Sequence, residues 1–183
     1  MILGIDPSLT GTGWCIMQKK TTDWEIIDKG ILKTAPEKGK RKIYKCDDDA
    51  RRIRYIFEGL TGLIGKYGIQ VCVTEAPSGG GKSASAVKGM AFATAIVACL
   101  AEAHQLALVT VTARASKKHN TGKANASKTE MQNAVVALFP ILGEEFFSAR
   151  AENGFTGDFE DIADSICAVL TVEKEPAVVM GAK

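Results

Sequence analysis

The chain opens with a short apolar run, residues 2–6, that ends on the carboxylate of Asp6 and is followed by Pro and Gly residues. Because Pro and Gly turn a chain sharply, the run predicts a buried strand that delivers Asp6 to the edge of a sheet. A single acid at a strand end decides nothing. Three further acids, Glu75, Asp161 and Asp164, are predicted at the same edge. We therefore expect the fold to gather four carboxylates around divalent metal.

The order of the predicted elements indicates a five-stranded mixed sheet with helices on its faces. Residues 2–5, 13–18 and 24–34 are predicted to be strands, and their short polar connections favour an antiparallel meander. Strands at 69–74 and 106–112 alternate with helices and are expected to be parallel, which makes the fold class α/β. The predicted helices span 47–66, 83–103, 127–139 and 159–171, with loops at 35–45 and 77–81, a loop or broken helix at 113–126 and a mixed segment at 140–157.

The length of 183 residues suits one domain with a substantial core. A hydrophobic content of 46% and a charged content of 24% are typical of a soluble globular protein. Neither a repeat nor an internal boundary interrupts the pattern. We therefore expect a single domain over residues 1–172 and a flexible C-terminal tail over residues 173–183.

The last predicted helix carries two of the acids. Asp161 and Asp164 are three residues apart, so they project from one side of the helix. Two solvated acids are the ordinary interpretation of such a pair. Here the segment 162–170 is otherwise nearly apolar, so the helix is expected to be largely buried, and acids at its margin then need partners.

Glu75 follows a β-branched, apolar strand and precedes a glycine-rich loop. Taken alone it is an ordinary acid at the end of a strand. Together with Asp6, Asp161 and Asp164 it completes a set of oxygen ligands, which suits Mg²⁺ or Mn²⁺, whereas zinc prefers His and Cys clusters. Two such ions roughly 3.5–4 Å apart activate a water and steady the leaving oxygen of a phosphodiester.

Residues 76–83 raise a different possibility, because Ala-Pro-Ser-Gly-Gly-Gly-Lys-Ser matches a loose Walker-A pattern between a strand and a helix. That interpretation predicts an ATP-binding protein with a phosphate at the helix N-terminus. The next strand, 106–112, contains no acid that could serve as a Walker-B residue. The alternative interpretation is a flexible loop whose Lys82 touches DNA phosphate.

The ordered set of motifs resembles the RuvC family of Holliday-junction resolvases, within the RNase H-like nuclease superfamily. Residues 2–13 resemble the opening strand and turn of the family, residues 71–75 its second acidic strand, and residues 161–168 its D-x-A-D-A final helix. Weaker similarities lie at residues 112–114 and 127–128. Each motif alone is weak, but they occur in the right order from residue 1 to about residue 172.

The resemblance implies an RNase H-like fold and a crossover-junction endodeoxyribonuclease that hydrolyses phosphodiesters by a two-metal mechanism and leaves 5′-phosphates. It implies that Asp6, Glu75, Asp161 and Asp164 bind two Mg²⁺ or Mn²⁺ ions, with Asp6 bridging them. Lys128 is expected to act near the scissile phosphate. Family members are homodimers that act on four-way junctions, and the long helix after the Glu forms part of their dimer interface.

Two departures bring the chain nearer to the phage-encoded branch, whose members act on a broader range of branched DNA. Cellular members carry an aromatic wedge shortly after the Glu, whereas residues 77–81 here contain none, and a basic insertion occupies residues 37–45. The net charge is only +2, and each basic cluster taken alone is an ordinary solvated surface. The residues expected to bind DNA backbone are Lys40, Arg41, Lys42, Lys82, Arg114, Lys117, Lys118, Lys123 and Lys128.

The five cysteines are scattered, odd in number and never in a C-x-x-C pair, which speaks against a disulfide framework or a zinc site. We therefore expect a protein of the bacterial cytoplasm, in which a phage-encoded member also acts, with no membrane partner. Three alternatives stay open: a non-catalytic DNA-binding relative, an ATP-binding protein of the actin-like kind, and another nuclease of the superfamily such as the YqgF type.

Overall fold

A five-stranded sheet separates two layers of helices in the computed structural model, which describes residues 1–21, 23–37, 44–76, 83–148 and 154–176. The strands are β1 (Ile2–Asp6), β2 (Gly11–Lys19), β3 (Trp24–Lys33), β4 (Val71–Ala76) and β5 (Ala107–Thr112). Their order in the sheet is β3-β2-β1-β4-β5. The three N-terminal strands form an antiparallel meander, and β4 and β5 run parallel to β1 and to each other, so the predicted mixed sheet is confirmed.

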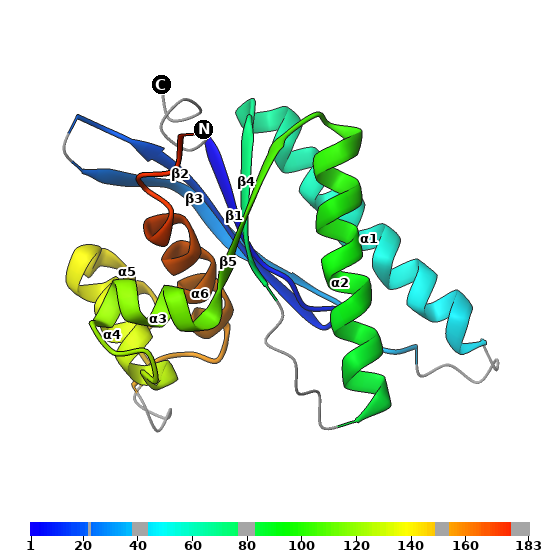
Figure 1. The fold of residues 1–183 in the computed structure, drawn as a ribbon. Coiled ribbons are helices and arrows are strands. Elements are labelled where there is room, and N and C mark those ends of the chain that lie inside the picture. Colours follow the sequence, from blue (N-terminus) through cyan, green and yellow to red (C-terminus); the bar gives the residue numbers. More distant parts are fainter. Residues whose placement is uncertain (22, 38–43, 77–82, 149–153, 177–183) are drawn as a thin grey trace.

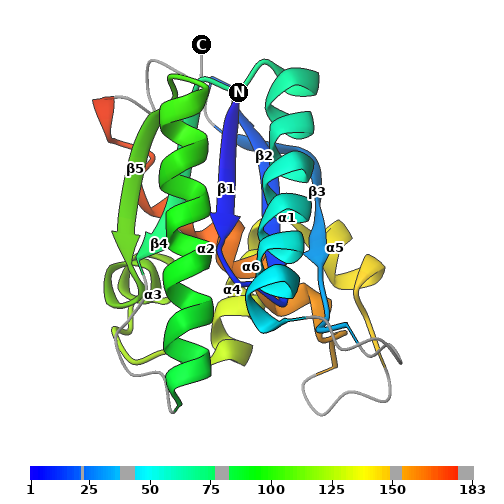
Figure 2. The same ribbon diagram turned by 90° about the vertical axis from the view of Figure 1, so that its right-hand side faces the viewer.

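Helices α1 (Lys45–Tyr67) and α2 (Ala84–Ala103) cover one face of the sheet (Figures 1 and 2). The opposite face carries α3 (Ala113–Thr121), α4 (Lys128–Leu138), α5 (Pro140–Glu145) and α6 (Asp158–Thr171). Each face has its own apolar core. Strand residues alternate between the two, so that Leu3 and Ile5 pack toward α1 and α2, whereas Ile2 and Val73 pack toward α6.

Local signals explain most element ends. Ser127 and Glu130 form the predicted capping box of α4, and the Ser83 hydroxyl accepts the Ala86 N–H at the start of α2. The segment 113–126, predicted to be a loop or broken helix, instead begins with a regular helix, α3. The Thr112 hydroxyl caps its first turn, and Gly122, with φ of 77°, ends it.

The interpretation of the basic region around residues 38–54 as solvated surface is wrong for Arg52. Its side chain is buried within α1, as are those of Asp48 and Asp49. The predicted loop of the basic insertion falls largely on residues 38–43, which lie outside the described residues. Residues 77–82 of the glycine-rich loop lie outside them as well.

Helix α2 is long and apolar enough to cross a membrane by length and composition alone, yet less than a third of it is buried inside the chain. It lies on the sheet beside α1 (Figure 2) and contributes Ile96, Val97 and Leu100 to the apolar core of that face. Packing of one side against the core of a globular domain accounts for part of this apolar character.

Candidate active site

The first two acids lie side by side at the same end of adjacent parallel strands. Ile5 pairs with Thr74 in the register of β1 and β4, and Asp6 and Glu75 are the next residue on each strand. Because side chains alternate along a strand, both acids point to the face that α6 covers, opposite to Ile5 and Thr74. The prediction that two strands deliver their acids to one edge is confirmed by this register.

Two glycines let α6 lie directly on the strands that carry these acids. A Cβ on Gly4 would come within 2.5 Å of the Ser165 carbonyl oxygen. A Cβ on Gly13, the partner of Asp6 in β2, would come within 2.2 Å of the Asp161 carbonyl oxygen. Both distances are shorter than any real contact of a Cβ atom. The backbone of α6 therefore touches the sheet where only glycine leaves room.

The close approach places the acids of α6 beside those of the strands. Burial raises the pKa of Asp6 well above its usual range, and the charges of Asp164, Asp161 and Glu75 raise it further. Burial also raises the pKa of Glu75, and the charge of Lys117 offsets part of that rise. The four predicted carboxylates are thus electrostatic neighbours, although they come from three distant segments of the chain.

The pKa values of the two helix acids are raised in the same way. Burial raises the pKa of Asp164 to about 7, with further contributions from Glu75 and Glu160. Burial also raises the pKa of Asp161 to about 6, and the charge of Glu160 adds to the rise. Burial is the main cause of both raised pKa values and neighbouring like charges add to it, and perturbed groups of this kind cluster at functional sites.

The chemistry of this donor set fits a hard divalent cation, since every ligand on offer is a carboxylate oxygen. Among the described residues, no three Asp, Glu, His or Cys side chains already surround a point where an ion would fit. The acids are close enough to repel one another, but their oxygens have not converged. A cation between them would remove the repulsion, so the charge pattern is consistent with the prediction that Asp6, Glu75, Asp161 and Asp164 bind metal.

Two lysines border the acids. Lys128, the first residue of α4, hydrogen-bonds to Glu160, which raises the pKa of the lysine, and Asp164 and Asp161 contribute to that rise. Lys117 of α3 is half-buried and close enough to Glu75 to lower the pKa of that acid. The predicted proximity of Lys128 to the acids is therefore observed, and Lys117 lies on the Glu75 side of the same group.

The other basic residues are more dispersed. Arg114 and Lys118 are exposed on α3, and Lys123 follows α3 and pairs with Glu130 at 2.6 Å. The remaining four predicted DNA contacts, Lys40, Arg41, Lys42 and Lys82, lie outside the described residues. Among the predicted DNA contacts that the structure describes, Lys117 of α3 and Lys128 of α4 act on the acids, and Lys33 of β3, which was not predicted, also lowers the pKa of Asp161.

Sequence reasoning missed two residues at this site. Glu160 contributes to the raised pKa of Asp6, Asp161 and Asp164, and it holds Lys128 in an ion pair. Its position directly before Asp161 in the sequence is the signal that could have identified it as part of the site. Gly13 was predicted only as the end of a turn and the first residue of a strand, although its pairing with Asp6 makes it a contact point for α6.

A mixed sheet in the order 3-2-1-4-5, with acids at the ends of β1 and β4 and on a helix laid across them, defines an RNase H-like fold of the nuclease type. The sequence model of the family described as "Crossover junction endodeoxyribonuclease RuvC" matches residues 2–145. This chain belongs to that family. The match includes Asp6 and Glu75 and ends before α6, so the two helix acids are located by the structure alone.

Individual relatives agree with this assignment. The crossover junction endodeoxyribonuclease RuvC of Methylococcus capsulatus is 30% identical over 147 residues, which cover 78% of this chain and 79% of that protein. The RuvC of Salinibacter ruber is 28% identical over 169 residues, or 91% of this chain and 83% of that protein, which carries the similarity beyond the end of the family match.

Two solved structures share the fold. Thermus thermophilus RuvC in complex with a Holliday junction substrate superposes with a TM-score of 0.72 at 16% identity and covers 99% of this chain and 96% of its own. The yeast mitochondrial Holliday junction resolvase superposes with a TM-score of 0.63 at 15% identity and covers 93% and 76% of the two chains. At such low identities these similarities establish the fold, and the arrangement of acids in this chain must support its chemistry.

Proposed function

We propose that this protein is a metal-dependent endonuclease that cuts four-way DNA junctions by phosphodiester hydrolysis and leaves 5′-phosphates. The observation that supports the proposal is the group of four half-buried, mutually repelling acids at the sheet edge, in a chain of the RuvC family. Family members are named crossover junction endodeoxyribonucleases, and the Thermus relative has been solved with a Holliday junction. Such a substrate suits a site that must bind a polyanion beside its own carboxylates.

Family members depend on divalent metal, and Asp6, Glu75, Asp161 and Asp164 would hold two Mg²⁺ or Mn²⁺ ions here. Bound metal lowers the pKa of the attacking water and stabilises the charge on the 3′-oxygen that leaves. The protein contributes ligand placement: β1 and β4 hold Asp6 and Glu75 at one level, and α6 presents the other two acids from the opposite side. The charges of Asp164, Asp161 and Glu75 all raise the pKa of Asp6, so Asp6 would be a ligand that the two ions could share.

The lysines would bind the DNA backbone beside the acids. Lys128 is the strongest candidate because it already lies among Glu160, Asp161 and Asp164, and it would exchange part of its Glu160 contact for a phosphate oxygen. Lys117 would act beside Glu75, and the exposed Arg114 and Lys118 extend the basic surface along α3. Contacts of this kind position the backbone and add salt-dependent affinity without reading bases.

We also propose that the protein is a homodimer that pairs through α2. One side of this helix exposes apolar residues at helical spacing, namely Val87, Ala91, Ala95, Ala98 and Cys99. The neighbouring edge strand exposes Leu108, which pairs with Cys72 and so faces the same side. Small residues permit two helices to approach closely. We expect Ala95→Glu to yield a monomer in sedimentation analysis, whereas Ala50→Glu, at an exposed position of α1, leaves the dimer intact.

A cleavage panel tests the nuclease proposal. Four-way, three-way, flap and duplex DNAs are incubated with the protein in Mg²⁺ and in Mn²⁺, and the ends are analysed for 5′-phosphates. We expect four-way junctions to be cut and linear duplex to be spared. Because residues 77–81 contain no aromatic wedge, cleavage of three-way or flap DNA is expected as well. Binding without cleavage of any branched DNA in either metal would favour the non-catalytic alternative, and equal cleavage of linear duplex would favour another nuclease of the superfamily.

The ATP-binding alternative has less support. β4 lies between β1 and β5. The strand that follows the loop in the chain, β5, has the sequence Ala-Leu-Val-Thr-Val-Thr and contains no acid that could serve as a Walker-B residue, and the acid that ends β1, Asp6, belongs to the acidic site. Most of the Walker-A-like loop falls on residues 77–82, outside the described residues. Titration with ATP and Mg²⁺ in a calorimeter tests this alternative, and we expect no saturable binding.

We further propose that the protein acts in the bacterial cytoplasm, where recombining DNA is found.

A further inference from the structure

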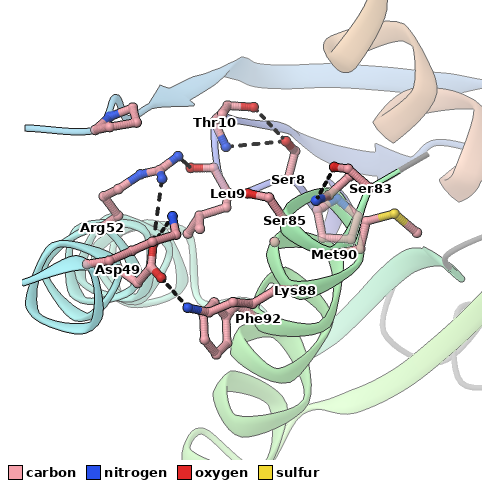
Figure 3. Close-up of a pocket in the computed structure, with 15 residues that line it drawn as sticks. Ser8, Leu9, Thr10, Asp49, Arg52, Ser83, Ser85, Lys88, Met90 and Phe92 are labelled. Atoms are coloured by element: carbon pink, nitrogen blue, oxygen red, sulfur yellow. Dashed lines mark hydrogen bonds and ion pairs between the residues drawn. The ribbon is translucent and has the colours of Figure 1, made fainter. Parts of the chain in front are cut away.

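The turn that follows Asp6 faces a cavity of about 510 Å³ between the first turns of α1 and α2 (Figure 3). Pro7, Ser8, Leu9 and Thr10 form one wall of this cavity. The Leu9 side chain is buried in the apolar core of this face, and polar contacts hold the backbone of the turn. Some are local: the Thr12 hydroxyl donates to the Ser8 carbonyl at 2.6 Å. The others come from α1.

The guanidinium of Arg52, on α1, hydrogen-bonds to this turn and to the segment beside it. Its Nη2 donates to the Leu9 carbonyl oxygen at 3.0 Å, and its Nε donates to the Thr34 hydroxyl at 2.8 Å. The Thr34 hydroxyl in turn donates to the same Leu9 carbonyl, and the Thr34 N–H donates to the Thr10 carbonyl oxygen at 2.9 Å. One guanidinium thus ties the turn to the segment that follows β3. Such a planar fork of donors has no equivalent in lysine.

The buried charge of Arg52 is balanced by Asp49, one turn earlier on α1. The two side chains are each 5% exposed, and 3.9 Å separates Arg52 Nη1 from Asp49 Oδ1. Asp49 Oδ2 lies 2.7 Å from Lys88 Nζ of α2, and Figure 3 shows the acid between the two cations. Lys88 is the first cause of the lowered pKa of Asp49. The three residues form a continuous ionic bridge from the turn to α2.

A displacement of this turn would shift the acids, because both of its ends are joined to the acidic site. Asp6 is three residues before Leu9, and Gly13, which pairs with Asp6, is four residues after it. Gly13 also touches the backbone of α6 at Asp161. Both ends of the turn are therefore parts of the acidic site, and a displacement of the Leu9 carbonyl changes the separation of Asp6 from the helix acids.

We propose that Arg52 and Asp49 are positioning residues for the metal-binding end of β1, and that Lys88 makes this positioning depend on α2. The inference deepens the proposed nuclease function and rests on it for its consequence in cleavage. It assigns no contact with substrate or metal to these residues. They act on Asp6 through the backbone of the turn, one step further from the metal than groups that hydrogen-bond to a ligand side chain.

The test compares Arg52→Lys, Asp49→Asn and Lys88→Met with the unmodified protein, and it uses Arg54→Gln as the control. Arg54 is exposed on the same helix, so its replacement removes one charge and leaves the bridge intact. Three quantities are measured for each protein: the dissociation constant for Mn²⁺ by calorimetry without DNA, the kcat and KM for junction cleavage, and the melting temperature.

We expect Arg52→Lys and Asp49→Asn to weaken Mn²⁺ binding about tenfold and to lower kcat about tenfold, because supporting residues of a metal site typically matter by 10- to 100-fold. The KM for the junction should stay within about twofold of the unmodified protein, and Lys88→Met should have a smaller effect in the same direction. Amides of residues 8–13 should exchange faster with solvent in all three variants. Arg54→Gln should change none of these quantities.

A purely structural role predicts a different result, namely a lower melting temperature with Mn²⁺ affinity within twofold of the unmodified protein, and that outcome overturns the inference. If Arg52→Lys does not fold, Asp49→Asn decides the question on the same criteria. Because Mn²⁺ binding is measured without DNA, the two proposals can fail separately. Absence of cleavage by the unmodified protein would reject the nuclease function, whereas unchanged Mn²⁺ affinity in the variants would reject the positioning role.

Discussion

Two groups of acids flank the turn after Asp6, and they are neutralised in opposite ways. On the α1 and α2 side, Asp49 is buried between Arg52 and Lys88, and its pKa is lowered. On the α6 side, Asp6 and Asp164 are half-buried beside other acids, and their pKa values are raised. The same residue type thus lies beside cations in one place and beside other acids in the other.

The difference separates a structural acid from a functional one. A buried carboxylate with a cation beside it favours the folded state, whereas buried carboxylates that face one another oppose it until a cation arrives. The basic residues near the α6 side offset only part of this charge. Lys128 lowers the pKa of Asp161 and of Asp164, yet both pKa values stay raised, and the ion pair of the lysine is with Glu160. The unbalanced charge at Asp6 therefore indicates where a divalent ion is expected to bind.

The largest expected effect comes from removing the charge of Asp6. We expect Asp6→Asn to bind junctions with little change in affinity and to cut them at least about 10³-fold more slowly, equivalent to roughly 4 kcal/mol in the barrier. A gel-based cleavage assay in Mg²⁺, beside a mobility-shift assay, measures both. Near-normal cleavage by this variant would contradict the distinction between functional and structural acids, because Asp6 would then not be needed for catalysis.

The second test disturbs the contact that brings the helix acids to the strand acids. We expect Gly13→Ala to destabilise the protein by about 3 kcal/mol, because its Cβ would overlap the Asp161 carbonyl oxygen, at 2.2 Å, and overpacking of this kind costs roughly 1–3 kcal/mol or more. Urea unfolding measures the change. Gly62→Ala is the matched control, since a Cβ there meets nothing within 4 Å and α1 should gain about 0.5–1 kcal/mol.

A third test uses pH. Metal ligands must be deprotonated, and burial raises the pKa of Asp164 to about 7 and that of Asp161 to about 6. We expect the Mn²⁺ affinity to fall about tenfold between pH 8 and pH 6, with a steeper fall below pH 6, because Asp164 protonates first. Calorimetry across this range measures it. A flat profile above pH 6 would show that the two helix acids are fully ionised without metal.

The smallest expected effect is a change in the free energy of unfolding, and its sign should differ between the two groups of acids. In chelator at pH 7.5, Asp164→Asn should stabilise the metal-free protein by about 1 kcal/mol, because it removes a buried like charge, whereas Asp49→Asn should destabilise it by about 1–3 kcal/mol. The raised pKa of Asp164 means that its favourable contribution is present at acid pH and lost as pH rises toward 7. For Asp49 the lowered pKa gives the reverse. Equal signs for the two variants in urea unfolding would contradict the comparison.

Much of this site could be predicted because its signals are local. An apolar run, a carboxylate and a turn predict the end of β1, and the same pattern predicts the end of β4. The spacing of Asp161 and Asp164 places them on one side of a helix whatever its surroundings. The capping box of α4 and the core stripe of α6, which includes Phe159, Ala163 and Ile166, also follow from periodicity and are buried as expected.

What could not be predicted depends on contacts between distant segments. The burial of Arg52 requires the Leu9 carbonyl and the Thr34 hydroxyl, which only the folded sheet brings to α1. In the sequence it is one of several basic residues in a polar region. Helix α3 was missed because its composition is polar and its helical structure depends on the Thr112 cap and on packing against α6.

The two glycines under α6 have a consequence for any mutational map of this protein. Gly4 and Gly13 possess no functional group, yet each marks a place where the missing side chain sets how far one ligand-bearing element stands from another. A saturation scan should therefore find two deeply intolerant positions that no search for reactive residues would select. Any residue that the fold did accept there would change the distance between the strand acids and the helix acids without replacing a single carboxylate.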